Sequence, residues 1–242
     1  MNMTHRFRLE AWAAVAAGLS TPADWQAWFR DPVPPDAAFV PDNATVPAAL
    51  RRRLAPLGRA ALSVAAAVRP DSPCPMVFLS RHGELRQTAE LLTQLATEGA
   101  VSPMGFSLSV HNAIAGIYGI AHADRVATTC IAANEDLAES GVVEALGWLS
   151  SGCEHVMLVC AEDPVPHPYA GDADEATFRH AWACRLAAGR EGDLSLEVHR
   201  SSAPTPAAHG VPPSLRALAF MAGAMPGVPR LETGRYRWQR HA

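Results

Sequence analysis

The sequence predicts an α/β domain in which a central mixed sheet carries helices on both faces. From Pro75 onward, strand-like and helix-like blocks alternate, which is typical of a sheet layered between helices. Residues 156–159 are apolar without interruption, as expected of a strand that is covered on both faces. The chain has 242 residues, of which 49% are hydrophobic, enough for one sizeable core and too few for two ordinary domains. We therefore expect a single domain over residues 1–242.

The first third of the chain predicts a strand, a short helix, a loop and a longer helix. Arg6 and Arg8 before an alanine-rich run imitate a secretory signal, but Glu10 interrupts the apolar segment, so we favour a strand followed by a short helix. Residues 31–47 are rich in proline and predict a surface loop. Residues 48–68 have helical spacing of apolar residues, and we expect the arginines at 51–53 to form a solvated face, with a docking patch as the alternative.

The middle of the chain has the clearest pattern. Two predicted helices, 84–97 and 137–150, each carry a stripe of apolar residues that we expect to face the core. Gly152 ends the second helix. The first stripe is Leu85, Ala89, Leu92 and Ala96, and the second is Ala138, Val142, Ala145, Leu146 and Leu149. The other elements predicted here are strand 76–80, a small-residue helix 109–120, strand 126–133 and strand 155–161.

After Asp163 the pattern is weaker. The prolines at 164, 166 and 168 predict a loop, and residues 178–188 fit either a strand or a helix. The remaining segments predict strand 194–200, helix 213–224 and a closing strand 233–240.

Composition excludes several classes of function. The net charge of −4 argues against a nucleic-acid partner, and all 20 basic residues are arginine, which excludes chemistry on a lysine amine. The apolar runs are too short to cross a bilayer. The five scattered cysteines fit free thiols in a cytoplasmic protein better than disulfides or a zinc site, and we expect no metal and no cofactor.

One short motif allows a hydrolase interpretation. Ser80-Arg81-His82-Gly83 follows a predicted strand and opens a helix, and it resembles the Arg-His-Gly signature of the histidine phosphatases. In that family the histidine accepts the phosphoryl group, and a second histidine late in the chain is required. Here only His209 could supply it, and His209 follows a segment of loop composition. A phosphatase-like hydrolase that uses Arg81 and His82 is therefore kept as the alternative.

A longer resemblance points elsewhere. The string Ser-Val-His-Asn-Ala-Ile-Ala-Gly at 109–116, the segment Ser-Pro-Met-Gly-Phe at 102–106 and the block from Phe78 to Glu84 resemble the amino-terminal half of β-ketoacyl synthases. The resemblance covers residues 50–169. It is strongest to the short chain length factors of aryl polyene and xanthomonadin-type pigment biosynthesis. It implies a thiolase-like fold, of which this chain has about one half.

The resemblance also indicates where a catalytic cysteine would lie. In complete synthases this residue occupies the turn between a strand and a helix, where the helix dipole lowers the thiol pKa. Counting back from Gly152 puts Glu135 at that position, so we expect no nucleophile in this chain. Cys130 lies within the predicted strand, and we interpret it as a core residue. His111 precedes a small-residue helix, which favours a structural hydrogen bond over catalysis.

The function that the resemblance implies is that of a non-catalytic chain length factor. Such a protein forms a heterodimer with a full-length β-ketoacyl synthase, shapes its acyl tunnel, and works on chains carried by an acyl carrier protein. Strand 126–133 would pair with the partner, and an apolar edge strand would be a liability in a monomer. A subunit that only stabilises the synthase is a further alternative. The expected partner-facing residues are Met104, Phe106, His111 and Asn112, and those of the dimer strand are Val126, Thr128, Cys130 and Ala132.

Overall fold

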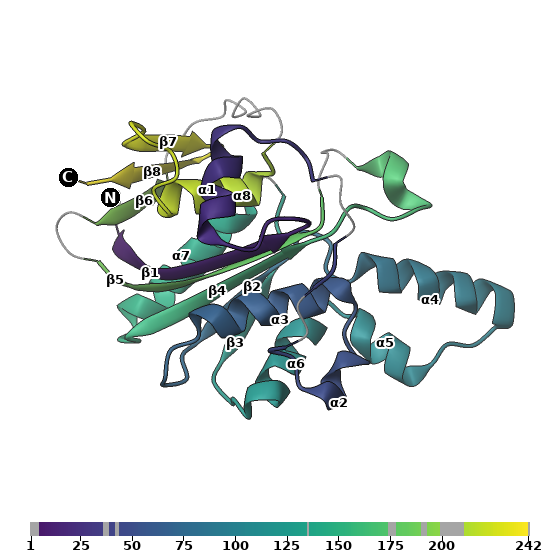
Figure 1. Ribbon diagram of the computed structural model, residues 1–242. Helices are drawn as coiled ribbons and strands as arrows, with labels where there is room; N and C mark the ends of the chain where they lie inside the picture. The colour runs from purple at the N-terminus through teal and green to yellow at the C-terminus, as the bar shows by residue number, and fades with distance from the viewer. Residues whose placement is uncertain are drawn as a thin grey trace.

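The computed structural model describes residues 5–35, 39–41, 44–134, 136–173, 178–189, 193–198 and 211–241. Within these ranges, eight strands form one mixed sheet in the order β3-β2-β4-β5-β1-β6-β8-β7 (Figure 1). The strands are β1 (His5–Ala16), β2 (Met76–Leu79), β3 (Thr128–Ile131), β4 (His155–Glu162), β5 (His180–Ala188), β6 (Leu194–Val198), β7 (Arg230–Thr233) and β8 (Tyr236–Arg240).

Helices cover both faces of this sheet, which confirms the predicted architecture (Figure 1). Helices α3 and α6 pack on one face, and α7, α8 and α1 pack on the other. A short 3-10 turn, Tyr169–Asp172, follows β4. The helices are α1 (Pro22–Arg30), α2 (Ala48–Arg51), α3 (Pro56–Val68), α4 (Leu85–Glu98), α5 (Pro103–Ser109), α6 (Ala113–His122), α7 (Leu137–Ser150) and α8 (Pro213–Met221).

The direction of the strands determines where loops gather. Strand β2 pairs in parallel with both β3 and β4, whereas β4, β5, β1, β6, β8 and β7 pair antiparallel along the rest of the sheet. The carboxyl ends of β2, β3 and β4 therefore meet at one edge. The loops that follow these three strands lie side by side there, which is where ligands and active sites occur in sheets of this kind.

Several predicted elements are confirmed with little change. Helix α7 has the predicted bounds, and all five residues of its predicted inward stripe are buried. Strand β4 is hydrogen-bonded between β2 and β5. Both of its faces are buried, as its uninterrupted apolar run predicts. The ambiguous segment 178–188 is strand β5, because it hydrogen-bonds to β4 on one side and to β1 on the other.

The single helix predicted for residues 48–68 is wrong. The structure has α2 and α3 with a break at 52–55. Pro56 is the first residue of α3, and Ala55 before it is extended, with φ −61° and ψ 165°. A residue that precedes proline is disfavoured in the helical region because its own backbone clashes with the proline ring. The proline therefore ends one helix and begins the next.

The helix predicted for residues 109–120 starts too early, because it corresponds to α6 (Ala113–His122), and a separate helix that was not predicted, α5 (Pro103–Ser109), precedes it. Residue Val110 is extended, so α5 ends at Ser109 and α6 starts at Ala113. Helix α5 begins with Pro103, and the Ser102 hydroxyl accepts a hydrogen bond from the Gly105 N–H at 3.3 Å. A serine cap followed by proline is a helix start that can be read from sequence.

Two further bounds differ from the prediction. The dimer strand predicted for 126–133 is shorter, since β3 covers only Thr128–Ile131 and leaves Val126 and Ala132 outside it. The closing strand 233–240 is a hairpin of β7 and β8, which turns at Gly234 with φ +52°. The strand and short helix predicted at the amino terminus are confirmed: the alanine-rich run belongs to β1, and α1 starts at Pro22.

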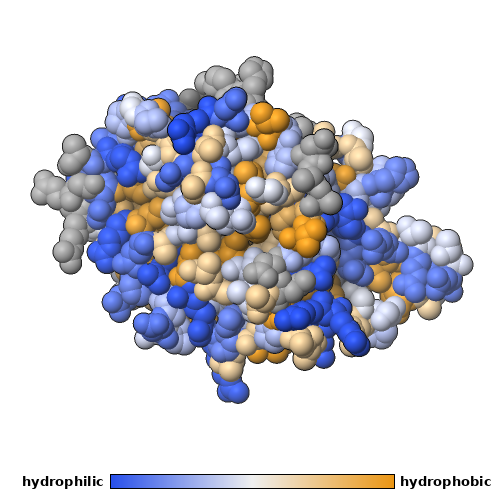
Figure 2. Space-filling model, in the orientation of Figure 1, coloured by the Kyte–Doolittle hydropathy of each residue, from blue (hydrophilic) through white to orange (hydrophobic). Residues whose placement is uncertain are grey.

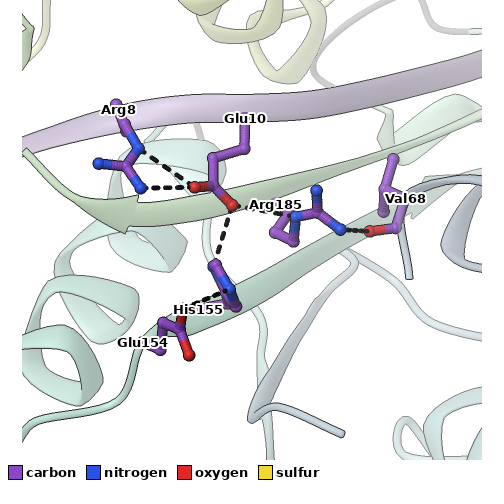
Figure 3. Close-up of polar contacts among 6 residues, drawn as sticks. All are labelled: Arg8, Glu10, Val68, Glu154, His155 and Arg185. Atoms are coloured by element: carbon purple, nitrogen blue, oxygen red, sulfur yellow. Dashed lines mark hydrogen bonds and ion pairs between the residues drawn. The ribbon is translucent and has the colours of Figure 1, made fainter. Parts of the chain in front are cut away.

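Glu10, which interrupts the apolar run of the amino-terminal segment, lies at a register shift between β1 and β5. Its carboxylate accepts from Arg8 Nη2 at 2.7 Å and from Arg185 Nε at 3.1 Å, and His155 Nδ1 lies 2.9 Å away (Figure 3). Burial opposes its ionisation, but the hydrogen bond from Arg8 and the nearby positive charges outweigh burial and lower the pKa of Glu10. Glu10 therefore links β1 to β5 through Arg185 and to β4 through His155.

None of the helices in the described part of the chain combines the length and the hydropathy that crossing a bilayer would require.

Candidate functional site

The loop after β2 is held in a defined shape by His111. The His111 ring donates from Nε2 to the backbone carbonyl of Ser80 at 2.7 Å and meets the Phe78 ring edge to face at 5.9 Å. The Ser80 hydroxyl accepts from the Gly83 N–H at 2.9 Å. Gly83 has φ +57°, and a Cβ there would lie 3.1 Å from the His111 ring. Glycine is thus required for both the backbone conformation and the close approach.

Arg81 connects the loops after β2, β3 and β4. Its backbone N–H donates to Glu162 Oε1 at 2.7 Å, and its guanidinium donates from Nη2 to Asn134 Oδ1 at 3.1 Å. Glu162 is the last residue of β4 and is buried. The three loops therefore form one hydrogen-bonded unit at the carboxyl ends of the parallel strands.

A second polar group lies beside this unit. Arg179 makes a bidentate ion pair with Asp163, at 2.8 and 2.9 Å, and Arg86 reaches the same carboxylate at 3.4 Å. Glu84 is buried, and burial together with the negative charge of Asp163 raises its pKa to about 7. Among the described residues, no group of three or more His, Cys, Asp or Glu side chains has the geometry to hold a metal ion.

The predicted nucleophile turn is at the start of α7. Glu135 itself is outside the described residues, as is His209 of the phosphatase alternative. Its neighbour Asp136 is the residue before α7 and forms an ion pair with Arg235, with Nε and Nη2 at 3.1 and 3.0 Å. Behind the turn, Gly141 packs on Leu79, and a Cβ on Gly141 would lie 2.6 Å from the Leu79 Cδ1 atom. This lets α7 lie close over β2.

All five cysteines are free thiols. Burial raises the pKa of Cys130, and it raises that of Cys74 to about 11 and that of Cys184 to about 12. Burial also raises the pKa of Cys160 well above its usual value. Since the thiolate is the nucleophile, these four residues are poor candidates for acyl transfer. Cys153 lies beyond the carboxyl end of α7, at the opposite end of that helix from the predicted turn.

The predicted partner-facing residues occupy two environments. Met104 and Phe106 lie on α5 with 58% and 62% of their surface exposed, and Asn112 is exposed at the start of α6. His111 is half-buried, and its ring is turned inward to Ser80. The structure therefore presents two large apolar side chains to the surface and uses the histidine to position a loop.

The predicted dimer strand is an edge strand. Strand β3 pairs only with β2 in the described sheet, and Met76 and Ser80 donate to the carbonyls of Ala127 and Ile131. Backbone groups alternate along a strand, so those of Thr128 and Cys130 face away from β2. Beside this edge lies a groove of about 550 Å³. It is lined by Asn112, Ala115, Gly116, Gly119, Ile120, Ala123, Asp124, Arg125, Thr128 and Cys130.

Sequence reasoning missed Glu162, Glu84 and Asn134 as members of this site. Glu162 directly follows a fully apolar strand, which is a usable signal because polar residues at the carboxyl ends of parallel strands often face a site. Glu84 had no such signal, since the two features that define its surroundings are distant in sequence: α3, which its carboxylate approaches at Gly58, and Asp163, whose charge raises its pKa.

Comparisons with known proteins agree with this geometry. The family described as "Beta-ketoacyl synthase, N-terminal domain" matches residues 25–239, a wider span than the residues 50–169 that carry the resemblance in the sequence. That match includes Arg81 and His82, so the Arg-His-Gly motif is part of the synthase-like domain. A search of curated proteins finds no significant match.

Solved structures show the same fold. A chain from the ketosynthase ApeO in complex with its chain length factor ApeC, from Xenorhabdus doucetiae, is 25% identical, with a TM-score of 0.78 over 98% of this chain and 99% of that chain. The ishigamide ketosynthase/chain length factor is 15% identical, with a TM-score of 0.65 over 91% and 83% of the two chains. The AntDE:AntF complex of a type II PKS acyl-carrier protein with its ketosynthase is 12% identical, with a TM-score of 0.62 over 76% and 62%.

The mixed sheet with helices on both faces is a thiolase-like fold, and its size is about half of a ketosynthase. The resemblance found in the sequence is thereby confirmed. The chain belongs to the β-ketoacyl synthase family, in which it represents the N-terminal domain.

Proposed function

We propose that this chain is a non-catalytic chain length factor. It forms a heterodimer with a full-length β-ketoacyl synthase and shapes the acyl tunnel during type II polyketide or fatty-acid-like elongation, with aryl polyene pigments as the product class. The observation that carries the proposal is the open edge made by β3 and α6. Its outward-facing backbone groups and its groove suit strand pairing with another subunit.

The thiol chemistry supports a non-catalytic role. A condensing enzyme needs an ionisable cysteine at a helix amino terminus, and residues 134–136 of this chain are Asn, Glu and Asp. Transfer of the acyl chain to cysteine, decarboxylation of the extender and carbon–carbon bond formation would then all occur in the partner. The match to a complex of a ketosynthase with its chain length factor supports the same division of roles.

The exposed side chains of α5 support a role in chain length. Met104 and Phe106 are large, apolar and exposed, and they lie on α5, which three residues separate from α6 at the proposed interface. Bulky apolar groups at the end of a tunnel limit how much of an acyl chain can be buried there. The growing chain would arrive on an acyl carrier protein, as in the type II PKS complex that shares this fold. Free thiols at all five cysteines support a reducing, cytoplasmic location.

The test is reconstitution with the full-length β-ketoacyl synthase from the same gene neighbourhood and its acyl carrier protein. The two chains should co-purify, and Met104→Ala or Phe106→Ala should shift the product distribution to longer chains. Val198→Ala, which truncates an equally exposed side chain on β6, is the matched control and should leave product length unchanged.

Two other outcomes would support the alternative functions. A stable heterodimer whose product length is unchanged in both variants, and in the double variant, makes the chain a structural subunit. Hydrolysis of a phosphoester by the isolated chain that depends on His82 makes it a hydrolase. If the synthase neither binds the chain nor responds to it, the proposal fails.

A further inference from the structure

Helix α4 carries an apolar stripe that the rest of the chain covers only in part. Residues 85, 89, 92, 95 and 96 lie on one side of the helix by their three- and four-residue spacing. At the start of the helix, Ala89 is buried and Leu85 is half-buried. Leu92 and Leu95 are 49% and 48% exposed, and Ala96 is exposed as well. The prediction that Leu92 and Ala96 face the core is therefore wrong, and the stripe continues past the body of the domain.

The exposed part of the stripe belongs to a well-defined hairpin. Gly99 ends α4 in the left-handed conformation, with φ +72°, and its N–H donates to the carbonyl of Leu95 at 3.0 Å. Ser102 then caps α5, and Gly105 of α5 packs against Leu91, whose Cδ2 would lie 3.1 Å from a Cβ on that glycine. Figure 1 shows the α4–α5 hairpin projecting from the body of the protein. Capped ends and close helix packing give it a fixed shape.

The opposite side of α4 is polar. Glu90 and Thr97 lie there and line a groove of about 490 Å³ together with Pro166 and His167 from the loop after β4, and Ala89 at the buried start of the stripe reaches its edge. Leu92 and Leu95 point away from this loop by helical geometry. On the projecting hairpin, Figure 2 shows apolar surface next to hydrophilic surface. The polar side of α4 is therefore turned toward the loop after β4, and the side that carries Leu92 and Leu95 is left largely uncovered by the described residues.

We propose that Leu92 and Leu95, at the outer end of α4, form a docking contact with the partner synthase that is distinct from the tunnel-facing residues of α5. This inference rests on the proposed function. The occupant follows from continuity of the surface. Helix α6 lies beside the β3 edge and contacts α5, which in turn contacts α4, and each step carries exposed apolar residues: Ile120 on α6, and Val110, Phe106 and Met104 on or next to α5.

The chemistry of the surface fits a folded protein partner. Exposed leucines at helical spacing recognise another apolar surface by burial, and they carry no charge that would select a nucleic acid or an anion. A rigid projecting hairpin can reach over a subunit that pairs along β3 and so enlarge the interface. Docking would then depend on α4, and product length would depend on α5.

The experiment compares Leu92→Ser/Leu95→Ser with Glu90→Ser/Thr97→Ser, a matched pair on the polar side of the same helix. Heterodimer affinity is measured with the full-length synthase from the same gene neighbourhood, and melting of the isolated chain verifies folding. We expect the leucine variant to weaken binding about thirtyfold, which corresponds to about 2 kcal/mol. The polar variant should bind as wild type does. At saturating synthase, the leucine variant should give the wild-type product length.

Three results would overturn the inference. In the first, the folded leucine variant binds the synthase with unchanged affinity, while an edge-strand variant, Thr128→Arg, loses binding. This result removes the inference but leaves the proposed function standing. Another is self-association of the isolated wild-type chain that the leucine variant abolishes, because the occupant is then a second copy. The last is failure of wild type to bind the synthase at all, which removes the proposed function as well.

Discussion

His111 donates from its ring Nε2 to the backbone carbonyl oxygen of Ser80 at 2.7 Å, across 31 residues of sequence. A carbonyl can only accept, so the proton is on Nε2 in this contact. The bond holds the loop after β2, from which Arg81 reaches the loops after β3 and β4. His111 therefore positions a loop, and this matches the structural role predicted for it.

His111→Phe should lower the free energy of unfolding by about 1–3 kcal/mol, because the buried Ser80 carbonyl loses its donor while an aromatic ring is kept. Thermal and urea unfolding measure this change. His111→Gln, which retains an N–H donor, should recover part of the loss. Condensation by a reconstituted heterodimer should be unchanged where all variants are folded, and a specific loss of turnover would contradict the structural role.

Glu84 should make stability depend on pH. Burial, then the charge of Asp163, raises its pKa from 4.5 to about 7 in the folded protein. The folded state therefore binds a proton that the unfolded state has lost between pH 4.5 and 7, so Glu84's contribution to stability falls as pH rises through this window and is constant above it.

Glu84→Gln removes this titration. We expect the stability difference between Glu84→Gln and wild type to shift in favour of the variant from pH 4.5 to pH 8, by on the order of 3 kcal/mol. Urea unfolding at a series of pH values measures it. A difference that does not change with pH would show that Glu84 is not held protonated.

Gly141 should be sensitive to substitution, in contrast to Gly147 on the same helix. A Cβ at Gly141 would lie 2.6 Å from the Leu79 side chain, whereas nothing lies within 4 Å of a Cβ at Gly147. Gly141→Ala should destabilise by about 1–3 kcal/mol through overpacking. Gly147→Ala should stabilise by about 0.5–1 kcal/mol through helix propensity. Equal effects of the two changes in thermal unfolding would mean that α7 is not in close contact with β2.

The edge strand should tolerate a charge in the isolated chain but not in the heterodimer. Thr128 is exposed on β3, so Thr128→Arg should leave the melting temperature unchanged. It should weaken binding to the synthase by tenfold or more, about 1.4 kcal/mol, since an arginine would be buried against the partner strand. Gln26→Arg is the control, because it adds the same charge at an exposed position on α1, away from the β3 edge. Normal binding by Thr128→Arg would exclude β3 as the pairing strand.

Part of this molecule could be predicted because its signals are local. The stripe of α7 and the apolar run of β4 depend on neighbouring residues, and both elements are as predicted. The sequence pattern alone did not separate α2 from α3 and did not predict α5. The signals were nevertheless present, because Pro56 and Pro103 are the first residues of α3 and α5, and proline favours the first position of a helix. Glu135 follows from counting in the sequence, and its surroundings lie outside the described residues.

The tertiary structure decided what each local element meets. Ala89 and Leu92 share one stripe of α4, yet only Ala89 is buried, because burial depends on how far the body of the domain extends along the helix. Strand β3 is an edge because of the order of strands, and Arg81 meets Glu162 although 81 residues separate them. Periodicity and capping act over a few residues and can be read from the sequence itself. Strand order and the pairing of distant side chains arise from contacts across the whole chain, so they appear only once it has folded.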